Sequence, residues 1–276
     1  MSLYIASLNS GSNGNCYYVG NDTEAILVDA GISCRETEKR MLRLGLSMNR
    51  VKAIFISHEH SDHIKGLCVL AKKYQIPVYI TPGTLVCSKL TLDDKLVRPF
   101  KPYQEVYVGD ICVTAFPKLH DAFDPHSFLI SCNGIRVGVF TDLGDVCDGL
   151  TLHFSQCHAA FLEANYDSDM LNNGRYPYYL KTRIRGGRGH LSNVQALNLF
   201  KASKPPYMTH LLLSHLSKDN NCPDLVHRLF SDHASNTEIV VASRYVETAV
   251  YKIDAGVYSP EIKQRVFVKA IQTSLF

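Results

Sequence analysis

The chain has 276 residues, of which 46% are hydrophobic and 20% charged, and its formal net charge is +3. This ordinary globular composition excludes a disordered chain, and the length allows a full hydrophobic core. We find no run of about 18 apolar residues and no basic, apolar leader, so we expect neither a membrane-spanning helix nor secretion. The nine cysteines are scattered without close pairs, which favours a reducing cytoplasm over a disulfide framework.

Strand and helix patterns alternate along the first half of the chain. Short apolar strands joined by glycine and asparagine turns come first, and a strand–helix–strand unit follows. The expected strands are Tyr4–Ser7, Cys16–Val19, Ala25–Asp29, Val51–Ser57 and Val78–Thr81, and the expected helices are Glu36–Leu44 and Asp62–Tyr74.

The second half is richer in strands. Its clearest turn is Asn133-Gly134, a dipeptide that favours a tight hairpin. The other expected elements are the strands Glu105–Val108, Ile111–Phe116, Val137–Thr141, Ala159–Glu163, Leu211–Ser214 and Glu238–Ala242 and the helix Asn193–Lys201. This order predicts an α/β (α+β) fold with two mixed sheets and helices outside them. No linker divides the chain, so we expect residues 1–276 to form one domain, with the tail beyond about residue 255 unplaced.

The most informative segment is His58-Glu59-His60-Ser61-Asp62-His63, which lies between an expected strand and an expected helix. His58 and His60 are two residues apart and point the same way in extended backbone. Asp62 and His63 follow the turn and can reach a second point. Imidazole and carboxylate groups are ligands for zinc, iron or manganese, so this loop predicts a site for two metal ions.

Four further candidates also stand at the ends of expected strands: Asp29, His120, Asp142 and His215. His126 competes with His120 for the second of these positions. We favour His120 because it directly follows the expected strand Ile111–Phe116, whereas His126 begins the next strand.

These five motifs, in this order, resemble the metallo-β-lactamase superfamily, and the resemblance implies a four-layer αββα sandwich. It also implies two divalent metal ions, zinc, manganese or iron, with a bridging hydroxide as the nucleophile. Asp29 would orient a ligand rather than bind metal. The implied ligands are His58, His60 and His120 for the first ion and Asp62, His63 and His215 for the second, with Asp142 bridging and Asp62 also counted as catalytic.

A second pair of residues indicates which reaction this centre performs. Glu163 ends an expected strand, and His190 precedes the expected helix at Asn193. The pair is similar to the glutamate and histidine of tRNase Z-type phosphodiesterases, in which the histidine protonates the leaving oxygen. An ordinary helix-start residue is the alternative for His190.

Further segments resemble the bacterial YycJ/WalJ-type nuclease family over roughly residues 1–250. They include Ser10-Gly11-Ser12-Asn13-Gly14-Asn15, His120-Asp121-Ala122 and Gly189-His190-Leu191-Ser192-Asn193. The resemblance implies a cytoplasmic, metal-dependent 5′-to-3′ DNA exonuclease. Tyr166 stands where we expect some relatives to carry histidine, and the Ser12–Asn15 loop is either part of the site or a plain turn.

Charge distribution points to the same substrate class. No acidic residue occurs from Met170 to Lys218, while basic residues and tyrosines are frequent there. We expect this stretch to grip a nucleic-acid backbone, with a solvated basic face as the alternative. The expected substrate-binding residues are Arg175, Arg183, Arg185, Arg188 and Ser192.

Other functions compatible with the motifs are a thioesterase or lactonase of the glyoxalase II kind and a non-catalytic, metal-bound nucleic-acid binder. A thiolate leaves without a general acid, so His190 discriminates the first alternative from a nuclease. The expected partner is nucleic acid, most of all DNA, with no membrane, and the sequence leaves room for a homo-oligomer.

Overall fold

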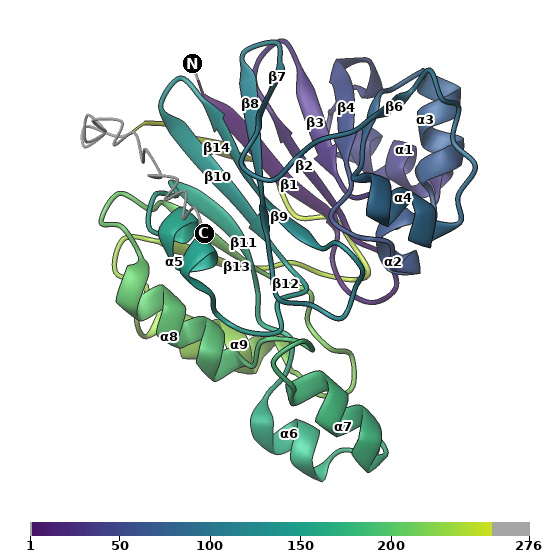
Figure 1. The fold of residues 1–276 in the computed structure, drawn as a ribbon. Helices are drawn as coiled ribbons and strands as arrows, with labels where there is room; N and C mark the ends of the chain where they lie inside the picture. The colour runs from purple at the N-terminus through teal and green to yellow at the C-terminus, as the bar shows by residue number, and fades with distance from the viewer. Residues whose placement is uncertain (1, 256–276) are drawn as a thin grey trace, which may run out of the picture.

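The computed structural model describes residues 2–255, and the tail that the sequence leaves unplaced lies outside these residues. Two seven-stranded mixed sheets pack face to face, with helices on both outer faces (Figure 1). The predicted αββα sandwich is confirmed. The first sheet has the order β14-β1-β2-β3-β4-β5-β6 and the second the order β13-β12-β11-β10-β9-β8-β7.

The strands of the first sheet are β1 (Leu3–Asn9), β2 (Cys16–Gly20), β3 (Ala25–Val28), β4 (Val51–Phe55), β5 (Val78–Tyr79), β6 (Val97–Arg98) and β14 (Tyr251–Ile253). Those of the second sheet are β7 (Glu105–Val108), β8 (Ile111–Pro117), β9 (His126–Cys132), β10 (Ile135–Phe140), β11 (Ala159–Glu163), β12 (His210–Ser214) and β13 (Glu238–Val241). Each sheet is antiparallel at one side and parallel at the other, with the change at β3 and at β10.

Helices follow the parallel strands and cover the outer faces. The first sheet carries α1 (Cys34–Arg43), a 3₁₀ turn (Met48–Arg50), α2 (Ser61–Ile64), α3 (Leu67–Tyr74) and α4 (Pro82–Ser88). The second half of the chain holds α5 (Asp148–Phe154), α6 (Ser168–Asn173), α7 (Tyr178–Arg185), α8 (Asn193–Ser203) and α9 (Pro223–Ser231). In Figure 1, α6 and α7 form a hairpin that projects away from the sheets.

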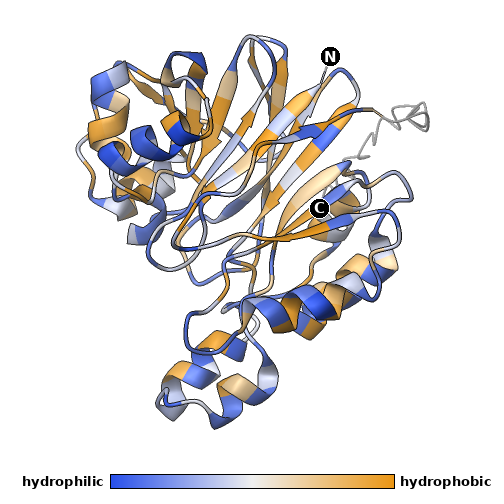
Figure 2. Cartoon of the chain, turned by 180° about the vertical axis from the view of Figure 1, so that it is seen from behind, coloured by the Kyte–Doolittle hydropathy of each residue, from blue (hydrophilic) through white to orange (hydrophobic). Residues whose placement is uncertain are grey.

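Side chains that alternate along the strands build the core. In β3, Ile26 and Val28 pack between the two sheets, whereas Leu27 packs against the outer helices. In β11, Phe161 faces the other sheet and Leu162 faces the helices. Because both faces of the central strands are buried, these strands are mainly apolar, as the orange bands of Figure 2 show. Within residues 2–255, no helix is long and apolar enough to cross a bilayer.

The predicted continuous helix Asp62–Tyr74 is wrong, because the chain breaks into α2 and α3 at Gly66. The Gly66 N–H donates to the carbonyl of Ala30 at 2.8 Å. A Cβ atom at Gly66 would lie 1.9 Å from the Ile32 carbonyl oxygen. This close approach of the Ala30–Ile32 backbone requires glycine and interrupts the helix.

Candidate metal centre

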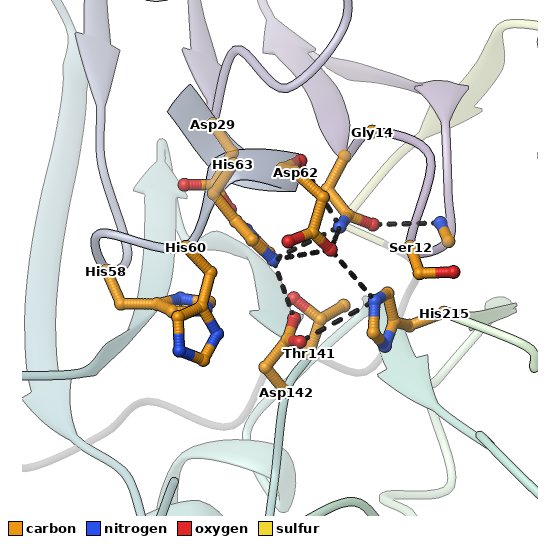
Figure 3. A network of polar contacts seen from close by, with 12 residues as sticks. Ser12, Gly14, Asp29, His58, His60, Asp62, His63, Thr141, Asp142 and His215 are labelled. Carbon is orange, nitrogen blue, oxygen red and sulfur yellow. Dashed lines mark hydrogen bonds and ion pairs between the residues drawn. The ribbon is translucent and has the colours of Figure 1, made fainter. Parts of the chain in front are cut away.

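The predicted site residues gather where the parallel strands of both sheets end. Asp29 follows β3, the His58–His63 loop follows β4, and Asp142 follows β10. Glu163 and His215 lie at the ends of β11 and β12. Because the sheets face each other, these strand ends meet across the sandwich, and Figure 3 shows the side chains of Asp62, His63, Asp142 and His215 converging.

Three of these residues have left-handed backbone conformations. The φ angles are 62° at Asp29, 55° at Asp142 and 57° at His215. Such angles are uncommon outside glycine, although aspartate and histidine tolerate them better than most residues, and they concentrate at functional sites. Here each one turns the chain sharply at a strand end.

His58, His60 and His120 form the first group. The His60 Nδ1 atom lies 3.3 Å from His120 Nε2, and the ring of His58 lies 4.6 Å and 4.8 Å from the other two ring centroids. Burial lowers the pKa of His120 to about 3 and the pKa of His58 well below its ordinary value. Both rings are therefore neutral, the form that binds metal.

Hydrogen bonds set which nitrogen of each ring is free. His120 Nδ1 lies 3.1 Å from the Gly189 carbonyl oxygen, which can only accept, so Nδ1 carries the proton. The Ser57 hydroxyl donates to Asp29 Oδ2 at 2.9 Å and therefore accepts from His58 Nδ1, also at 2.9 Å. In both rings the lone pair is left on Nε2 and faces the site.

Asp62, His63, Asp142 and His215 form the second group. His63 Nε2 lies 3.2 Å from Asp142 Oδ2 and 3.6 Å from Asp62 Oδ2. His215 Nε2 lies 3.5 Å from Asp62 Oδ2 and 3.6 Å from Asp142 Oδ1. Asp142 thus borders both groups, because its Oδ1 atom is also 3.9 Å from His120 Nε2.

Asp29 stands behind this group. Its carboxylate accepts hydrogen bonds from the Ser57 N–H at 2.8 Å, from the Ser57 hydroxyl and from His63 Nδ1 at 2.7 Å. The side chain is fully buried. Asp29 is therefore placed to orient His63 directly and His58 through Ser57.

The carboxylates of the second group favour positive charge on its two histidines. Burial disfavours a charged His215, but the carboxylates of Asp142, Asp62 and Glu163 outweigh it and raise the pKa of His215 to about 10. The pKa of His63 is likewise raised well above its ordinary value by Asp142, Asp29 and Asp62, against the effect of burial.

Two buried ring nitrogens fit a metal ion. His58 Nε2 and His215 Nε2 have no hydrogen-bond partner among the described residues. Leaving such polar atoms unpaired is costly, and a cation between them and the carboxylates would satisfy them. The ligand atoms within each group lie within 4.8 Å of one another, close enough to hold one divalent ion per group.

Glu163 and His190 form a third arrangement beside the two groups. Glu163 Oε1 lies 2.8 Å from His190 Nδ1 and 3.0 Å from His215 Nδ1. Its Oε2 atom accepts from the Leu143 and Leu191 N–H groups. Burial opposes the charge of Glu163, but His190 and His215 lower its pKa to about 2. One carboxylate therefore holds a histidine of the second group and the adjacent His190.

His190 faces a pocket of about 190 Å³, whose other lining residues include Ser12, Asp121, Tyr176, Arg183 and Ser217. The His190 side chain is 20% exposed, whereas Glu163 is fully buried. A substrate group in this pocket can therefore reach His190 but not Glu163.

The structure brings His120, rather than His126, to the other histidines. His126 begins β9, where its ring packs against Phe100 at 5.4 Å. Its Nδ1 atom donates to the Asp124 carbonyl at 2.9 Å.

The predicted substrate-binding residues are not all at the pocket. Arg183 lines it, whereas Arg185 lies over the Tyr178 ring at 5.7 Å. Arg175 and Arg188 are exposed. Ser192 is instead the buried N-cap of α8, where its hydroxyl and the Gln195 side chain form a capping box.

Two groups at the site are not assigned as site residues from the sequence, although the sequence leaves open whether the Ser12–Asn15 loop is part of the site. Asn15 Nδ2 lies 3.1 Å from His63 Nε2 and 3.2 Å from Asp62 Oδ2, so the Ser12–Asn15 loop belongs to the site. Asp121 Oδ1 lies 3.4 Å from His120 Nε2. The signals that could have found them are the glycine-rich turn around Asn15 and a carboxylate directly after a candidate ligand.

Comparisons with known proteins agree with this fold. The model of the Beta-lactamase superfamily domain matches residues 24–215. The chain is 38% identical over 230 residues to exodeoxyribonuclease YycJ of Bacillus anthracis, a match that covers 82% of this chain and 86% of that protein. It is 30% identical over 258 residues to exodeoxyribonuclease WalJ of Streptococcus pneumoniae, covering 92% and 95% of the two chains. Among solved structures, the metallo-beta-lactamase fold protein YhfI from Bacillus subtilis shares the fold, with a TM-score of 0.70 and 19% identity over 91% of this chain and 100% of that one.

Proposed function

The chain belongs to the beta-lactamase superfamily, and we propose that within it the protein is a metal-dependent nuclease, a DNA exonuclease that works from the 5′ end. The names of the relatives YycJ and WalJ support an exodeoxyribonuclease. The direction of cleavage rests on the family resemblance of the sequence motifs.

We assign one divalent ion to His58, His60 and His120 and a second to Asp62, His63 and His215, with Asp142 shared. Zinc, manganese and iron all suit these donors. When bound, two such ions lower the pKa of water and neutralise charge on phosphate oxygens. Asp62 and Asp142 both belong to the second group, and Asp142 also lies near His120 of the first group, so its carboxylate can serve both ions.

The observation that carries the proposal is the contact between Glu163 and His190. A phosphodiester expels an alkoxide, which needs a proton as it leaves. Because His190 Nδ1 is bound to Glu163 at 2.8 Å, Nε2 is the nitrogen left to deliver that proton. A thioesterase has no use for this pair, since a thiolate leaves without help.

The α6–α7 hairpin supplies positive charge beside the pocket. Arg183 lines the pocket, and Arg175, Arg185 and Arg188 are exposed on the same segment. The exposed rings of Tyr178 and Tyr179 stand among them. Cations that track phosphates and rings that stack on bases are the two devices of single-strand binding.

The test uses protein loaded separately with zinc and with manganese, and end-labelled single- and double-stranded DNA and RNA. We expect stepwise shortening of DNA from the 5′ end, slowed about 10²–10⁴-fold by His190→Ala. His233→Ala is the matched control, because His233 is exposed and distant in sequence from every proposed ligand. Thioester hydrolysis without cleavage of any nucleic acid would overturn the proposal.

A further inference from the structure

The carboxylate of Asp121 lies at the edge of the three-histidine group formed by His58, His60 and His120. Its Oδ1 atom is buried and has no hydrogen-bond partner among residues 2–255. The same atom lies 3.4 Å from His120 Nε2, the nitrogen that holds a lone pair because Nδ1 donates to Gly189. His60 Nδ1, at 3.3 Å, can donate to His120 Nε2, but no group of the described residues donates to Asp121 Oδ1. Burying this carboxylate oxygen beside a ring nitrogen that carries a lone pair is unfavourable unless a cation lies between them.

The loop that carries Asp121 is held on both sides. The Phe123 N–H donates to Glu59 Oε1 at 2.8 Å, which ties the loop to the His58–His63 segment. On the other side, Lys118 Nζ donates to the Thr141 carbonyl at 2.7 Å, next to Asp142. The position of Asp121 is therefore set by the metal-binding loops themselves.

Arg183 occupies the other oxygen of this carboxylate. Its Nε atom lies 2.5 Å from Asp121 Oδ2. The Arg183 side chain is 59% exposed and stands on α7, a helix with no buried residue. Arg183 also lines the pocket in front of His190, where the phosphate of a nucleic acid would compete for it.

We propose that Asp121 contributes a carboxylate to the ion of the three-histidine group, and that Arg183 sets how much negative charge it offers. Paired with Arg183, Asp121 attracts the ion weakly. A phosphate that draws Arg183 away leaves the full carboxylate charge to the ion. Metal binding and substrate binding thereby strengthen each other, as linkage requires. This inference rests on the proposed metal-dependent function.

The test measures zinc affinity by competition with a chromophoric chelator, without any nucleic acid. Asp121→Asn keeps the side-chain volume and removes the charge, and we expect one of the two binding steps to weaken about 10- to 100-fold. Arg183→Gln should tighten the same step about two- to fivefold, the range of an exposed ion pair. Arg185→Gln, on the same helix but turned to Tyr178, is the control and should leave the zinc affinity of both steps unchanged.

The double variant separates this mechanism from simple repulsion between Arg183 and the ion. Because Arg183 acts through Asp121, Arg183→Gln should have no effect in the Asp121→Asn background. Equal tightening in both backgrounds, or unchanged affinity in a folded Asp121→Asn variant, would overturn the inference. Wild-type protein that binds neither zinc nor manganese would overturn the proposed function as well, whereas normal wild-type binding with unchanged variants would overturn this inference alone.

Discussion

The two halves of the molecule reach the metal centre with the same strand pattern and different chemistry. In each sheet the first parallel strand, β3 or β10, is followed by an aspartate with a left-handed backbone, Asp29 or Asp142. Asp29 is saturated by hydrogen bonds from Ser57 and His63. Asp142 faces the imidazoles of both groups instead. Equivalent backbone positions thus carry a hydrogen-bonded supporting carboxylate in the first half and, in the second, a carboxylate that we propose as the shared ligand.

The largest effect should come from replacing Asp142, the aspartate that faces the imidazoles of both groups. Asp142→Asn removes the charge shared by the two groups, so we expect the protein to hold fewer than two ions. The cleavage rate should fall by more than the ~10²–10⁴-fold expected for loss of a general acid. Metal content by mass spectrometry and the rate on labelled DNA check this. Two tightly bound ions in a folded variant would contradict it.

The strands next to β3 and β10 also differ between the two halves. Strand β4 leads to the histidines of the His58–His63 loop, whereas β11 ends in Glu163. Glu163→Gln removes the charge that holds both His190 and His215. We expect a loss of about 10²–10⁴-fold in cleavage rate together with weaker binding of one ion. His190→Ala should lower the rate but spare metal affinity. If the two variants have the same metal affinity, Glu163 does not couple the histidines.

Asp29→Asn tests the supporting aspartate, whose carboxylate accepts hydrogen bonds from Ser57 and His63. Because Asp29 acts through Ser57 and His63, the variant should keep both ions and bind them about 10- to 100-fold more weakly. Titration calorimetry against Asp142→Asn ranks the two positions. An effect as large as that of Asp142→Asn would mean that the two aspartates play equivalent roles.

The carboxylates around His215 predict a pH effect on the stability of the metal-free protein. The pKa of His215 is raised to about 10 in the folded state, so its charge stabilises the fold fully below about pH 6.5 and is lost as the pH rises toward 10. We expect the Tm of metal-free protein to fall in this window by at least about 2–4 °C, the equivalent of 1 kcal/mol. Zinc-loaded protein should lack this fall, because the ion replaces the proton. Parallel curves would contradict this reading.

The smallest effects are expected at the exposed arginines outside the pocket. Arg175→Gln or Arg188→Gln should leave metal affinity unchanged and weaken DNA binding. Each should reduce the slope of log affinity against log salt by about 1 if the side chain contacts a phosphate. An unchanged slope would assign the pocket arginine, Arg183, the larger share of backbone binding.

The elements that sequence predicted well are those in which packing leaves a pattern. The strand ends carrying Asp29, His58, Asp142 and His215 follow apolar runs that are buried on both faces. Helix α7 escaped prediction because it buries none of its residues and so has no apolar period. The break at Gly66 comes from a backbone contact 34 residues away, between Gly66 and Ile32. No local pattern records such a contact.

The site shows the same division. Motif spacing indicated the residues that stand at strand ends. From the sequence, the role of the Ser12–Asn15 loop stays open and Asp121 has no assigned role, because their contacts depend on which loops meet in space. Asn15 reaches His63 from the first turn of the chain, and Asp121 is held by Arg183 of a distant helix. Contacts between separate loops leave no spacing in the sequence.

Metal-dependent cleavage of DNA is tested most directly with protein that is stripped of metal and then reloaded with manganese or zinc. We expect no cleavage of 3′-labelled duplex DNA by the stripped protein and stepwise shortening from the 5′ end after reloading, with reloaded Asp142→Asn inactive. Cleavage that persists without metal, or intact DNA after both metal sites are filled, would contradict it.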